Sequence, residues 1–498
     1  MMKKIQLKRI CAFLMSVILT FCACAQSGEN GGTAADHSDV QTESGAEETE
    51  KLYLDNLPEK SDYNGIEMRF LTALETISVE LSEEDDTGEV VKGAYWRRNH
   101  ALEERLNVDI VLAEQVGYDA FNSVAGQSIT AGSDDYDILC GHTRFNVKLA
   151  SEGSVLNLND YGFGDYIDIS QPYWSELYIS NINYRDNLYW LAGDMTHSFI
   201  SYIYAMFVNS TVWNNYYNGE DIYDIVLEGG WTLDTLHQYA EGTYTDNNGD
   251  TRRDAGDSYG VIMQQGNVLN GMIFAANVQY TGIDDSGEYY VALNNEHTVD
   301  VYSKLHTMFY ETEYGLMLGN EAYITQCVKM FSEDRVLFCP RQFHFTEEDG
   351  IRSMESDFYI IPLPKYDAAQ ENYRVNQYDG VPIYGVPTTL PEERIPAVAS
   401  TLEAMCSMTS QMVIPVYYDV ALKDKYSRDE TTAQMIDLIH DSITADFCFY
   451  WGDSVGGLMG FFYKNIQTKD IASKMRSSEK IWQRSLGSLL ERLEEADA

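Results

Sequence analysis

Positively charged residues are scarce in this 498-residue sequence, which has 34 Lys and Arg residues against 78 Asp and Glu residues. The formal net charge of −44 repels phosphate backbones and anionic lipid surfaces, so nucleic acid is excluded as a partner. Beyond the N-terminal region, no apolar run reaches the roughly 20 residues that a membrane-spanning helix needs. The hydrophobic content of 44% is ordinary for a globular protein with large cores.

Cysteine is also scarce, and three of the eight cysteines lie close to the N-terminus. The other five are odd in number and widely spaced, so they imply no disulfide framework, and at most two pairs can form. We expect buried free thiols. These five are Cys140, Cys327, Cys339, Cys406 and Cys448.

Short catalytic motifs are missing as well: there is no HExxH, phosphate loop, dinucleotide fingerprint or Cys/His metal cluster. Residues 452–456 have the G-x-S-x-G spacing of a nucleophile elbow and follow a predicted strand at 447–451. A hydrolase of that type needs a histidine after its serine, but the last histidine is His440, which precedes Ser454. We therefore expect no catalysis at this turn.

The N-terminus has the pattern of a bacterial lipoprotein signal, with basic residues, an apolar stretch at 11–21 and a small residue just before Cys24. The apolar stretch is shorter than a membrane span and runs into polar residues, so we expect residues 1–23 to be removed. Cys24 then carries acyl chains that anchor the protein to the extracellular face of the cell membrane. Secretion without a lipid, after cleavage at Ala23, is the alternative.

Residues 24–60 are expected to form the lipidated cysteine and a flexible acidic tether, because their first half has almost nothing to bury. From there on, short apolar runs alternate with helical periodicity, which predicts an α/β fold with largely parallel sheets. Two strand candidates that lie far apart, 204–209 and 381–386, suggest two lobes and a cleft if both cross between lobes. The other predicted strands are 66–74, 108–112 and 136–140, and the predicted helices are 95–106, 145–152 and 479–496.

Residues 246–257 have the spacing of a calcium-binding loop, in which six positions supply oxygen atoms to a cation that prefers about seven. The loop resembles those of dockerins and EF-hands, but Asp257 stands where a bidentate Glu is usual and Thr251 where Gly is usual. We expect a structural Ca²⁺; a solvated Asx-rich turn between two helices is the alternative. The expected ligands are Asp246, Asn248, Asp250, the carbonyl of Arg252, Asp254 and Asp257.

Aromatic residues are abundant, with 36 tyrosines and 7 tryptophans. Such rings stack on the apolar C–H faces of sugars, although most of them are expected to pack in the core or lie on the surface.

Several stretches together resemble family 1 extracellular solute-binding proteins of ABC importers. The resemblance covers about residues 62–495 and depends on the order and spacing of the stretches rather than on one decisive motif. They are residues 94–99 (AYWRRN), 106–110 (LNVDI), 131–138 (AGSDDYDI), 230–234 (GWTLD) leading into the calcium-like loop and 259–260 (YG), 402–404 (LEA) and 415–418 (PVYY).

The resemblance implies a two-lobed, periplasmic-binding-protein-like fold of type II, each lobe a mostly parallel sheet flanked by helices. Lobe 1 is expected at residues 61–200 plus 385–435, and lobe 2 at 201–384 plus 436–498. The resemblance also places a first hinge after residues 193–196 and the return hinge at 384–388.

Ligand contacts are implied in the same way, where a strand ends in the cleft, near the first hinge and at an aromatic pair of lobe 2, for which packing in the core is the alternative. A maltose-type segment has Asp where Thr143 stands, so the implied sugar need not be maltose-like. The implied contacts are His142, Thr143, Arg144, Asp194, Met195, Tyr450 and Trp451.

The sequence thus predicts a lipid-anchored, monomeric solute-binding protein without catalytic activity, which captures a carbohydrate, an oligosaccharide in particular, and delivers it to ABC permease subunits. Two alternatives stay open: a membrane-anchored glycan-degrading enzyme, since some carboxylate pair at glycosidase spacing must occur by chance among 78 acidic residues, and a glycan-binding adhesin.

Overall fold

The structure has two halves, each built around one sheet. The first half contains a four-stranded sheet in the order β11-β3-β1-β2. The central strand β1 (Ile66–Thr72) pairs in parallel with β2 (Val108–Gln115) and with β3 (Ile138–His142). Strand β11 (Pro382–Gly385) comes from a distant part of the sequence and pairs antiparallel to β3. All five residues of β3 are buried, as expected for an apolar run in the middle of a sheet.

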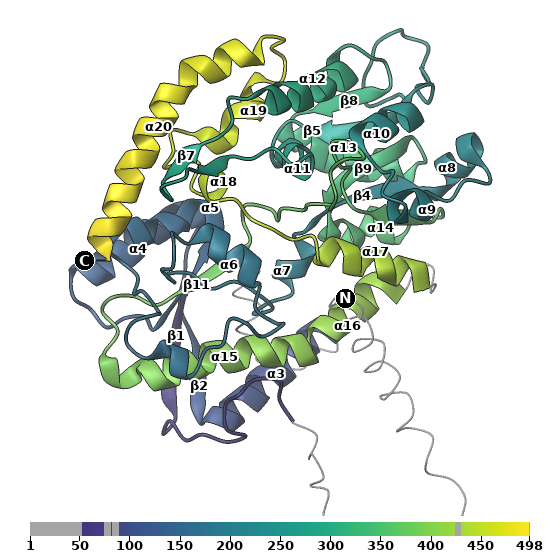
Figure 1. Cartoon of the computed structure of the whole chain (residues 1–498). Helices are drawn as coiled ribbons and strands as arrows, with labels where there is room; N and C mark the ends of the chain where they lie inside the picture. Colours follow the sequence, from purple (N-terminus) through teal and green to yellow (C-terminus); the bar gives the residue numbers. More distant parts are fainter. Residues whose placement is uncertain (1–51, 74–80, 82–88, 424–429, 498) are drawn as a thin grey trace, which may run out of the picture. The chain divides into compact units, whose positions relative to one another are not determined.

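This computed structural model describes residues 52–73, 81, 89–423 and 430–497 (Figure 1). The predicted signal peptide 1–23, Cys24 and the tether up to residue 51 lie outside the described residues. Residues 51–498 form one compact unit that contains both sheets.

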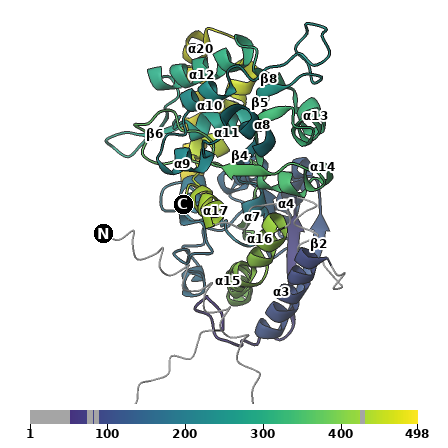
Figure 2. The same cartoon turned by 90° about the vertical axis from the view of Figure 1, so that its right-hand side faces the viewer.

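Helices cover the first sheet, and α3 (Val90–Leu106) packs along the long α15 (Ile395–Met412) (Figure 2). The Arg98 guanidinium donates to Thr409 Oγ1 at 2.8 Å and joins the two helices. Alanine, serine and threonine are frequent in α15, so it can be almost entirely buried. The other helices of this half are α4 (Tyr118–Thr130), α5 (Thr143–Asn146), α6 (Glu176–Ile182), α7 (Ser198–Ser201), α16 (Ile414–Lys423) and the 3₁₀ turns η1 (Val147–Glu152), η2 (Phe163–Asp165) and η4 (Glu392–Arg394).

A five-stranded sheet forms the second core, in the order β10-β4-β9-β5-β8. Strand β5 (Tyr259–Gln264) pairs in parallel with β8 (Gly315–Leu318) and β9 (Val336–Gln342). Strand β4 (Tyr204–Asn209) pairs antiparallel with both β9 and β10 (Phe358–Ile361). Both sheets are therefore mixed, and in each a parallel set of three strands continues through antiparallel pairing on one side only.

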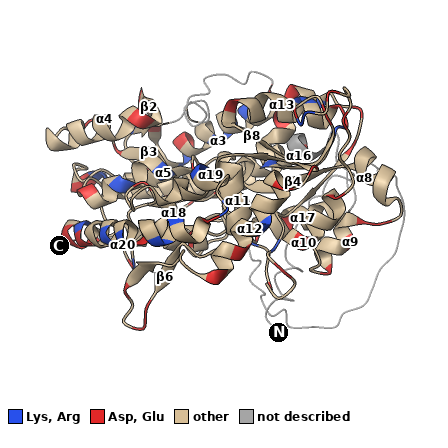
Figure 3. Ribbon diagram, turned by 90° about the horizontal axis from the view of Figure 1, so that it is seen from above, with Lys and Arg blue, Asp and Glu red and all other residues tan. Residues whose placement is uncertain are grey.

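The second half also contains most of the shorter helices. A two-stranded ladder of β6 (Thr281–Ile283) and β7 (Tyr289–Val291) projects from it, with acidic residues at the tip (Figure 3). The helices are α8 (Ser210–Tyr217), α9 (Ile222–Leu227), α10 (Leu233–Ala240), α11 (Asn267–Ala275), α12 (Glu296–Tyr310), α13 (Asn320–Ser332), α14 (Asp349–Arg352), α17 (Glu430–His440), α18 (Phe447–Tyr450) and α19 (Phe461–Asn465), with 3₁₀ turns η3 (Phe343–Glu347) and η5 (Leu458–Gly460).

Three segments lie side by side between the two sheets. Ile203, just before β4, pairs with Gln377, which precedes β11. Val375 pairs in turn with Ile443, which follows α17. The predicted strands 204–209 and 381–386 are confirmed, but each lies inside a sheet, and the crossings are the residues immediately before them. The exact lobe boundaries predicted from the sequence stay a prediction.

The final helix, α20 (Ile471–Ala496), contacts both halves (Figure 1). Near its end, Glu494 accepts a hydrogen bond from Tyr184 OH at 3.2 Å, in the segment after α6. In its middle, the Gln483 side chain bonds both the N–H and the carbonyl of Val291 in β7, at 3.1 and 2.9 Å. The predicted helix at 479–496 is thus confirmed and begins two turns earlier.

The predicted strand at 447–451 is wrong, because these residues form the helical turn α18. The aromatic run has a high strand propensity, but Asp446 caps the turn by accepting from the Phe449 N–H at 3.1 Å. The predicted free, buried thiols are confirmed for all five cysteines. Among the described residues, no helix combines the length and apolar character that crossing a bilayer requires.

Candidate functional site

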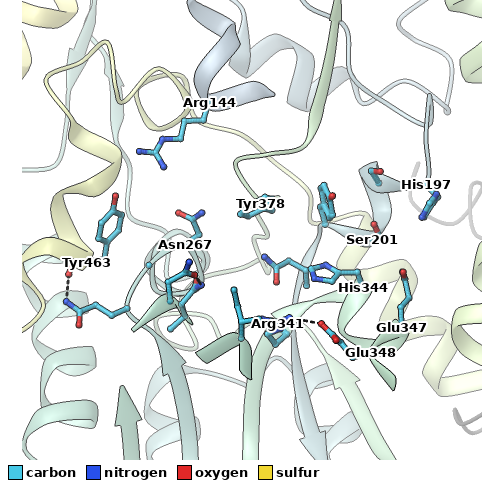
Figure 4. Close-up of a pocket in the computed structure, with 18 residues that line it drawn as sticks. Arg144, His197, Ser201, Asn267, Arg341, His344, Glu347, Glu348, Tyr378 and Tyr463 are labelled. Atoms are coloured by element: carbon cyan, nitrogen blue, oxygen red, sulfur yellow. Dashed lines mark hydrogen bonds and ion pairs between the residues drawn. The ribbon is translucent and has the colours of Figure 1, made fainter. Parts of the chain in front are cut away.

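A cavity of about 660 Å³ lies at the junction of the two halves (Figure 4). Its lining residues follow the carboxyl ends of β3, β5, β8 and β9, where α/β proteins commonly bind ligands. The crossing segments, α7, η3 and α19 contribute the remaining wall. The lining residues are Arg144, His197, Ser198, Ser201, Tyr202, Gln264, Gln265, Gly266, Asn267, Asn320, Ile324, Arg341, Gln342, His344, Glu347, Glu348, Tyr378 and Tyr463.

Arg144 connects the first half to the other walls of the cavity. Its Nε and Nη2 donate to the two carboxylate oxygens of Asp453 at 2.9 and 3.2 Å, and its Nη1 donates to Asp379 Oδ2 at 3.1 Å. Asn267 Nδ2, at the start of α11, donates to the other Asp379 oxygen at 2.9 Å. Burial raises the pKa of Asp379 to about 6, although Arg144 opposes this shift.

Three tyrosine rings face the cavity at the crossings and at α19. Tyr202 and Tyr378 lie edge to face with centroids 5.6 Å apart, and the Tyr378 N–H donates to the Tyr202 carbonyl at 2.9 Å. Tyr463 belongs to α19, and its carbonyl accepts from Gln265 Nε2 at 2.9 Å. Tyrosine offers both an apolar face and a hydroxyl, which suits contact with sugar rings.

A guanidinium and an imidazole of the second half lie across the cavity from Arg144 (Figure 4). Arg341, at the end of β9, is only 4% exposed. Its Nη2 is 3.7 Å from Glu348 Oε1, too long for a hydrogen bond. Burial, with a contribution from Arg341, lowers the pKa of His344 to about 4, so this imidazole is neutral at pH 7.

Of the seven predicted ligand contacts, Arg144 is the one that lines the cavity. His142 and Thr143 are buried beside it: the His142 ring packs against Phe145 and Tyr378, and Thr143 Oγ1 donates to the Val381 carbonyl at 2.6 Å. Burial and the nearby Arg144 lower the pKa of His142 to about 3.

The predicted contacts near the first hinge are also buried. The Met195 side chain is in the core, and its carbonyl accepts from Thr409 Oγ1 of α15 at 3.2 Å. Asp194 is 9% exposed, and burial raises the pKa of its carboxyl to about 6, opposed by the charge of His440. The Thr409 hydroxyl therefore holds the backbone at Met195 against α15.

Tyr450 and Trp451 are 0% and 1% exposed, respectively, and point into the protein rather than the cavity. Tyr450 OH donates to the carbonyl of Gln377 at 3.1 Å, and Trp451 Nε1 donates to the carbonyl of Ile182 at 2.8 Å. The helical turn of α18 causes this placement, because it turns both rings onto the crossing segment and α6. The two side chains therefore hold backbone segments next to the cavity and do not line it.

The predicted calcium loop connects α10 to β5, so it follows a helix but precedes a strand. Asp246 accepts from the N–H groups of Gly249 and Thr251 at 2.7 and 3.0 Å, and Asp257 is buried. Thr251 has a φ of +62°, in the left-handed region that favours glycine. Among the described residues, no three His, Cys, Asp or Glu side chains converge as a metal site.

Tyr202, Tyr378, Tyr463 and Arg341 were not predicted from the sequence. A signal for Arg341 was present, because it follows the apolar run Val336–Cys339 as a polar residue at the end of a buried strand. The tyrosines gave no comparable signal, since their positions depend on how the crossings and α19 pack.

No protein-family model and no curated protein matches the sequence. Solved structures, however, share its fold. UspC of Mycobacterium tuberculosis aligns with a TM-score of 0.55 and 12% identity, over 84% of this chain and 100% of that one. An ABC substrate-binding protein of Listeria monocytogenes, in complex with cycloalternan, gives 0.50 and 10%, over 87% and 98%.

The GacH receptor of Streptomyces glaucescens, solved without ligand and with acarbose, gives a TM-score of 0.50 and 12% identity, over 86% of this chain and 99% of that one. The chain therefore has the two-lobed, periplasmic-binding-protein-like α/β fold of ABC solute-binding proteins. At these identities the similarity concerns the fold.

Proposed function

We propose that the protein is an extracellular solute-binding protein of an ABC importer, which captures a carbohydrate in the cavity between its two halves and delivers it to a permease. The observation that carries the proposal is the cavity itself. Its volume of about 660 Å³ is typical of ligand sites, and both halves and the crossing segments contribute to its wall. Tyrosine rings and amide side chains supply the contacts that a sugar needs.

A ligand held by both halves favours the closed arrangement, because it binds that arrangement more tightly than an open one. The paired crossings at Ile203 and Gln377 are the proposed hinge, since they are the narrow connection between two packed sheets. Arg144, which bonds Asp379 and Asp453, is the proposed polar contact across the cleft.

The direct experiment is isothermal titration calorimetry against a panel of mono- and oligosaccharides, with analysis of the sugars before and after incubation. We expect binding of at least one sugar without cleavage. Tyr463→Ala should weaken it by about 1 kcal/mol if the ring stacks. Tyr216→Ala is the matched control, because Tyr216 lies on α8, is 49% exposed and is not among the lining residues.

Release of new reducing ends that persists across independent preparations would instead support a glycan-degrading enzyme. Binding only to long, insoluble glycans, with no adjacent permease genes, would support an adhesin. Two permease genes next to this one would support import.

We propose a lipid anchor at Cys24, based on the signal pattern of residues 1–23. Cys24→Ala should move the protein from the membrane fraction to the soluble fraction, and the wild type should release acylated peptides that mass spectrometry detects. Equal fractionation of the two forms would contradict the anchor. A monomer in size-exclusion chromatography is also expected.

We further propose that residues 246–257 bind a structural Ca²⁺. The oxygen-rich side chains follow the spacing of known calcium loops, and the ligand set of Asp246, Asn248, Asp250, Asp254 and Asp257 with the Arg252 carbonyl suits a hard cation. A bound ion would fix the connection between α10 and β5. Strand β5 ends at Gln264, which lines the cavity.

A further inference from the structure

Resting on the proposed function, we propose that the saccharide carries an anionic group and that the Arg341 guanidinium binds this group. Arg341 is an unusual buried cation. Its side chain is 5% exposed, and its Nε makes no hydrogen bond. Among the described residues, no side chain or carbonyl accepts a hydrogen bond from its other nitrogens either.

The surroundings of Arg341 offer two aromatic ring faces and one carboxylate beyond hydrogen-bond distance. The Arg341 Cζ lies 5.5 Å from the centroid of the Tyr323 ring and 5.3 Å from that of Phe345. The nearest carboxylate, Glu348, is 3.7 Å away and its side chain is 40% exposed, so solvent screens it. A buried guanidinium with five donors normally has charged or polar acceptors, because desolvation is costly otherwise.

The cavity supplies the direction from which such an acceptor can come, since Arg341 is part of its lining. A carboxylate or phosphate group on a sugar matches the planar fork of a guanidinium with two parallel hydrogen bonds. Glu348 is also at the cavity wall and exposed enough to rotate aside, so a ligand anion can exchange with it.

Two helix N-termini reach the same wall. Helix α13 starts at Asn320, a lining residue, and its N-cap Gly319 has no side-chain cap. Helix α11 starts at Asn267, but there the Gln264 Oε1 atom already accepts from the Val268 N–H at 3.1 Å. The partial positive charge at the N-terminus of α13 therefore favours an anion in the cavity more than that of α11 does.

The other charged lining residues do not compensate Arg341. Arg144 is already paired with two carboxylates on the opposite side, and Glu347 accepts from Tyr417 OH at 2.8 Å. His344 is uncharged at pH 7. The net charge of the whole protein opposes an anion only at long range, where salt of physiological strength screens it beyond about 8 Å.

The test compares matched ligands by calorimetry: oligogalacturonates and oligoglucuronates, each with its uncharged methyl ester, and glucose 6-phosphate with glucose. We expect one charged probe to bind at least about tenfold tighter than its uncharged partner, given the strength of hydrogen bonds between charged groups. A preference in the uronate pairs identifies a carboxylate, and one in the glucose pair identifies a phosphate.

Variants tie the preference to the residue. Arg341→Gln should abolish it, while Arg352→Gln, which removes the same charge from an exposed position in α14, should leave it intact. Because Arg341→Gln changes a buried site, Glu348→Gln provides the second measurement: it removes the competing carboxylate and should tighten binding of the charged probe several-fold. Thermal melts establish that each variant is folded.

Equal affinity for charged and uncharged partners, or binding of neutral oligosaccharides alone, overturns this inference and leaves the proposed function in place. A preference that survives in folded Arg341→Gln, or that Glu348→Gln weakens, overturns the role of Arg341. Binding of no sugar of any kind overturns the proposed function.

Discussion

Replacing Arg144 with methionine tests the polar contact across the cavity, because methionine keeps the aliphatic stem and removes the guanidinium. Two carboxylates lose a partner, in different surroundings: the side chain of Asp379 is 4% exposed and that of Asp453 is 42% exposed. Removing one partner of a buried ion pair costs about 3 to 5 kcal/mol, whereas an exposed pair contributes about 1 kcal/mol or less. We expect Arg144→Met to lower the free energy of unfolding by about 3 kcal/mol at pH 8.

The cost should depend on pH through Asp379. Burial raises the pKa of this carboxyl to about 6 with Arg144 present, and without Arg144 the pKa rises further. At pH 8 the variant must keep a buried, poorly paired negative charge, but at pH 5 the carboxyl takes up a proton and the penalty disappears. We therefore expect the cost to fall to about 1 kcal/mol at pH 5.

Urea unfolding followed by circular dichroism at pH 8 and pH 5 measures these free energies. In an Asp379→Asn background, Arg144→Met should cost about 1 kcal/mol at both pH values, whereas in an Asp453→Asn background the cost of about 3 kcal/mol at pH 8 should remain. Stronger coupling of Arg144 to Asp453 than to Asp379, or an equal cost at both pH values, would refute this reasoning.

Three other outcomes are expected. Trp451→Ala should lower stability by about 3 to 5 kcal/mol and leave sugar affinity nearly unchanged, since the ring is buried against Phe447; a large loss of affinity in a folded variant would contradict this placement. Burial raises the pKa of the Asp194 carboxyl to about 6, so the wild type loses free energy of unfolding as this carboxyl ionises between about pH 4 and pH 6. Relative to wild type, Asp194→Asn should therefore gain up to about 3 kcal/mol in free energy of unfolding over this range. An unchanged difference between pH 4 and pH 8 in urea titrations would exclude this. A calcium chelator should lower the melting temperature of the wild type but not of an Asp246→Ala, Asp250→Ala double mutant. Thr251→Gly should increase the chelator-induced decrease in melting temperature, because glycine adopts the positive φ of this position without strain. An equal decrease in wild type and double mutant argues against an ion in this loop.

Much of the fold could be predicted from local pattern. Strands β3 and β4 are short, mostly apolar runs, and helix α20 repeats buried residues such as Trp482, Leu486 and Leu493 at helical spacing. The exception, at 447–451, shows how a cap and packing override strand propensity in a short aromatic run. What local pattern does not contain is the antiparallel placement of β11 beside β3, which joins segments more than 200 residues apart.

The site was harder to predict than the fold. Of the contacts that the resemblance implies, Arg144 lies in the cavity lining, as do Arg341 and Gln264 at the ends of β9 and β5. His142 and Thr143 lie beside the cavity and are buried, against neighbouring rings and the Val381 carbonyl. Burial is decided by the whole assembly of elements and is not encoded in spacing.

The long helix α20 has a consequence for how a ligand leaves. Gln483 bonds the backbone of β7 in the second half, and Glu494, several turns later, bonds Tyr184 in the first half, so the helix connects the two halves. A rotation of the two halves that opens the cavity must therefore bend α20 or break the contacts of its last turns. We therefore expect the hydrogen bond between Tyr184 and Glu494, which lies outside the cavity lining, to affect the rate at which a bound ligand dissociates.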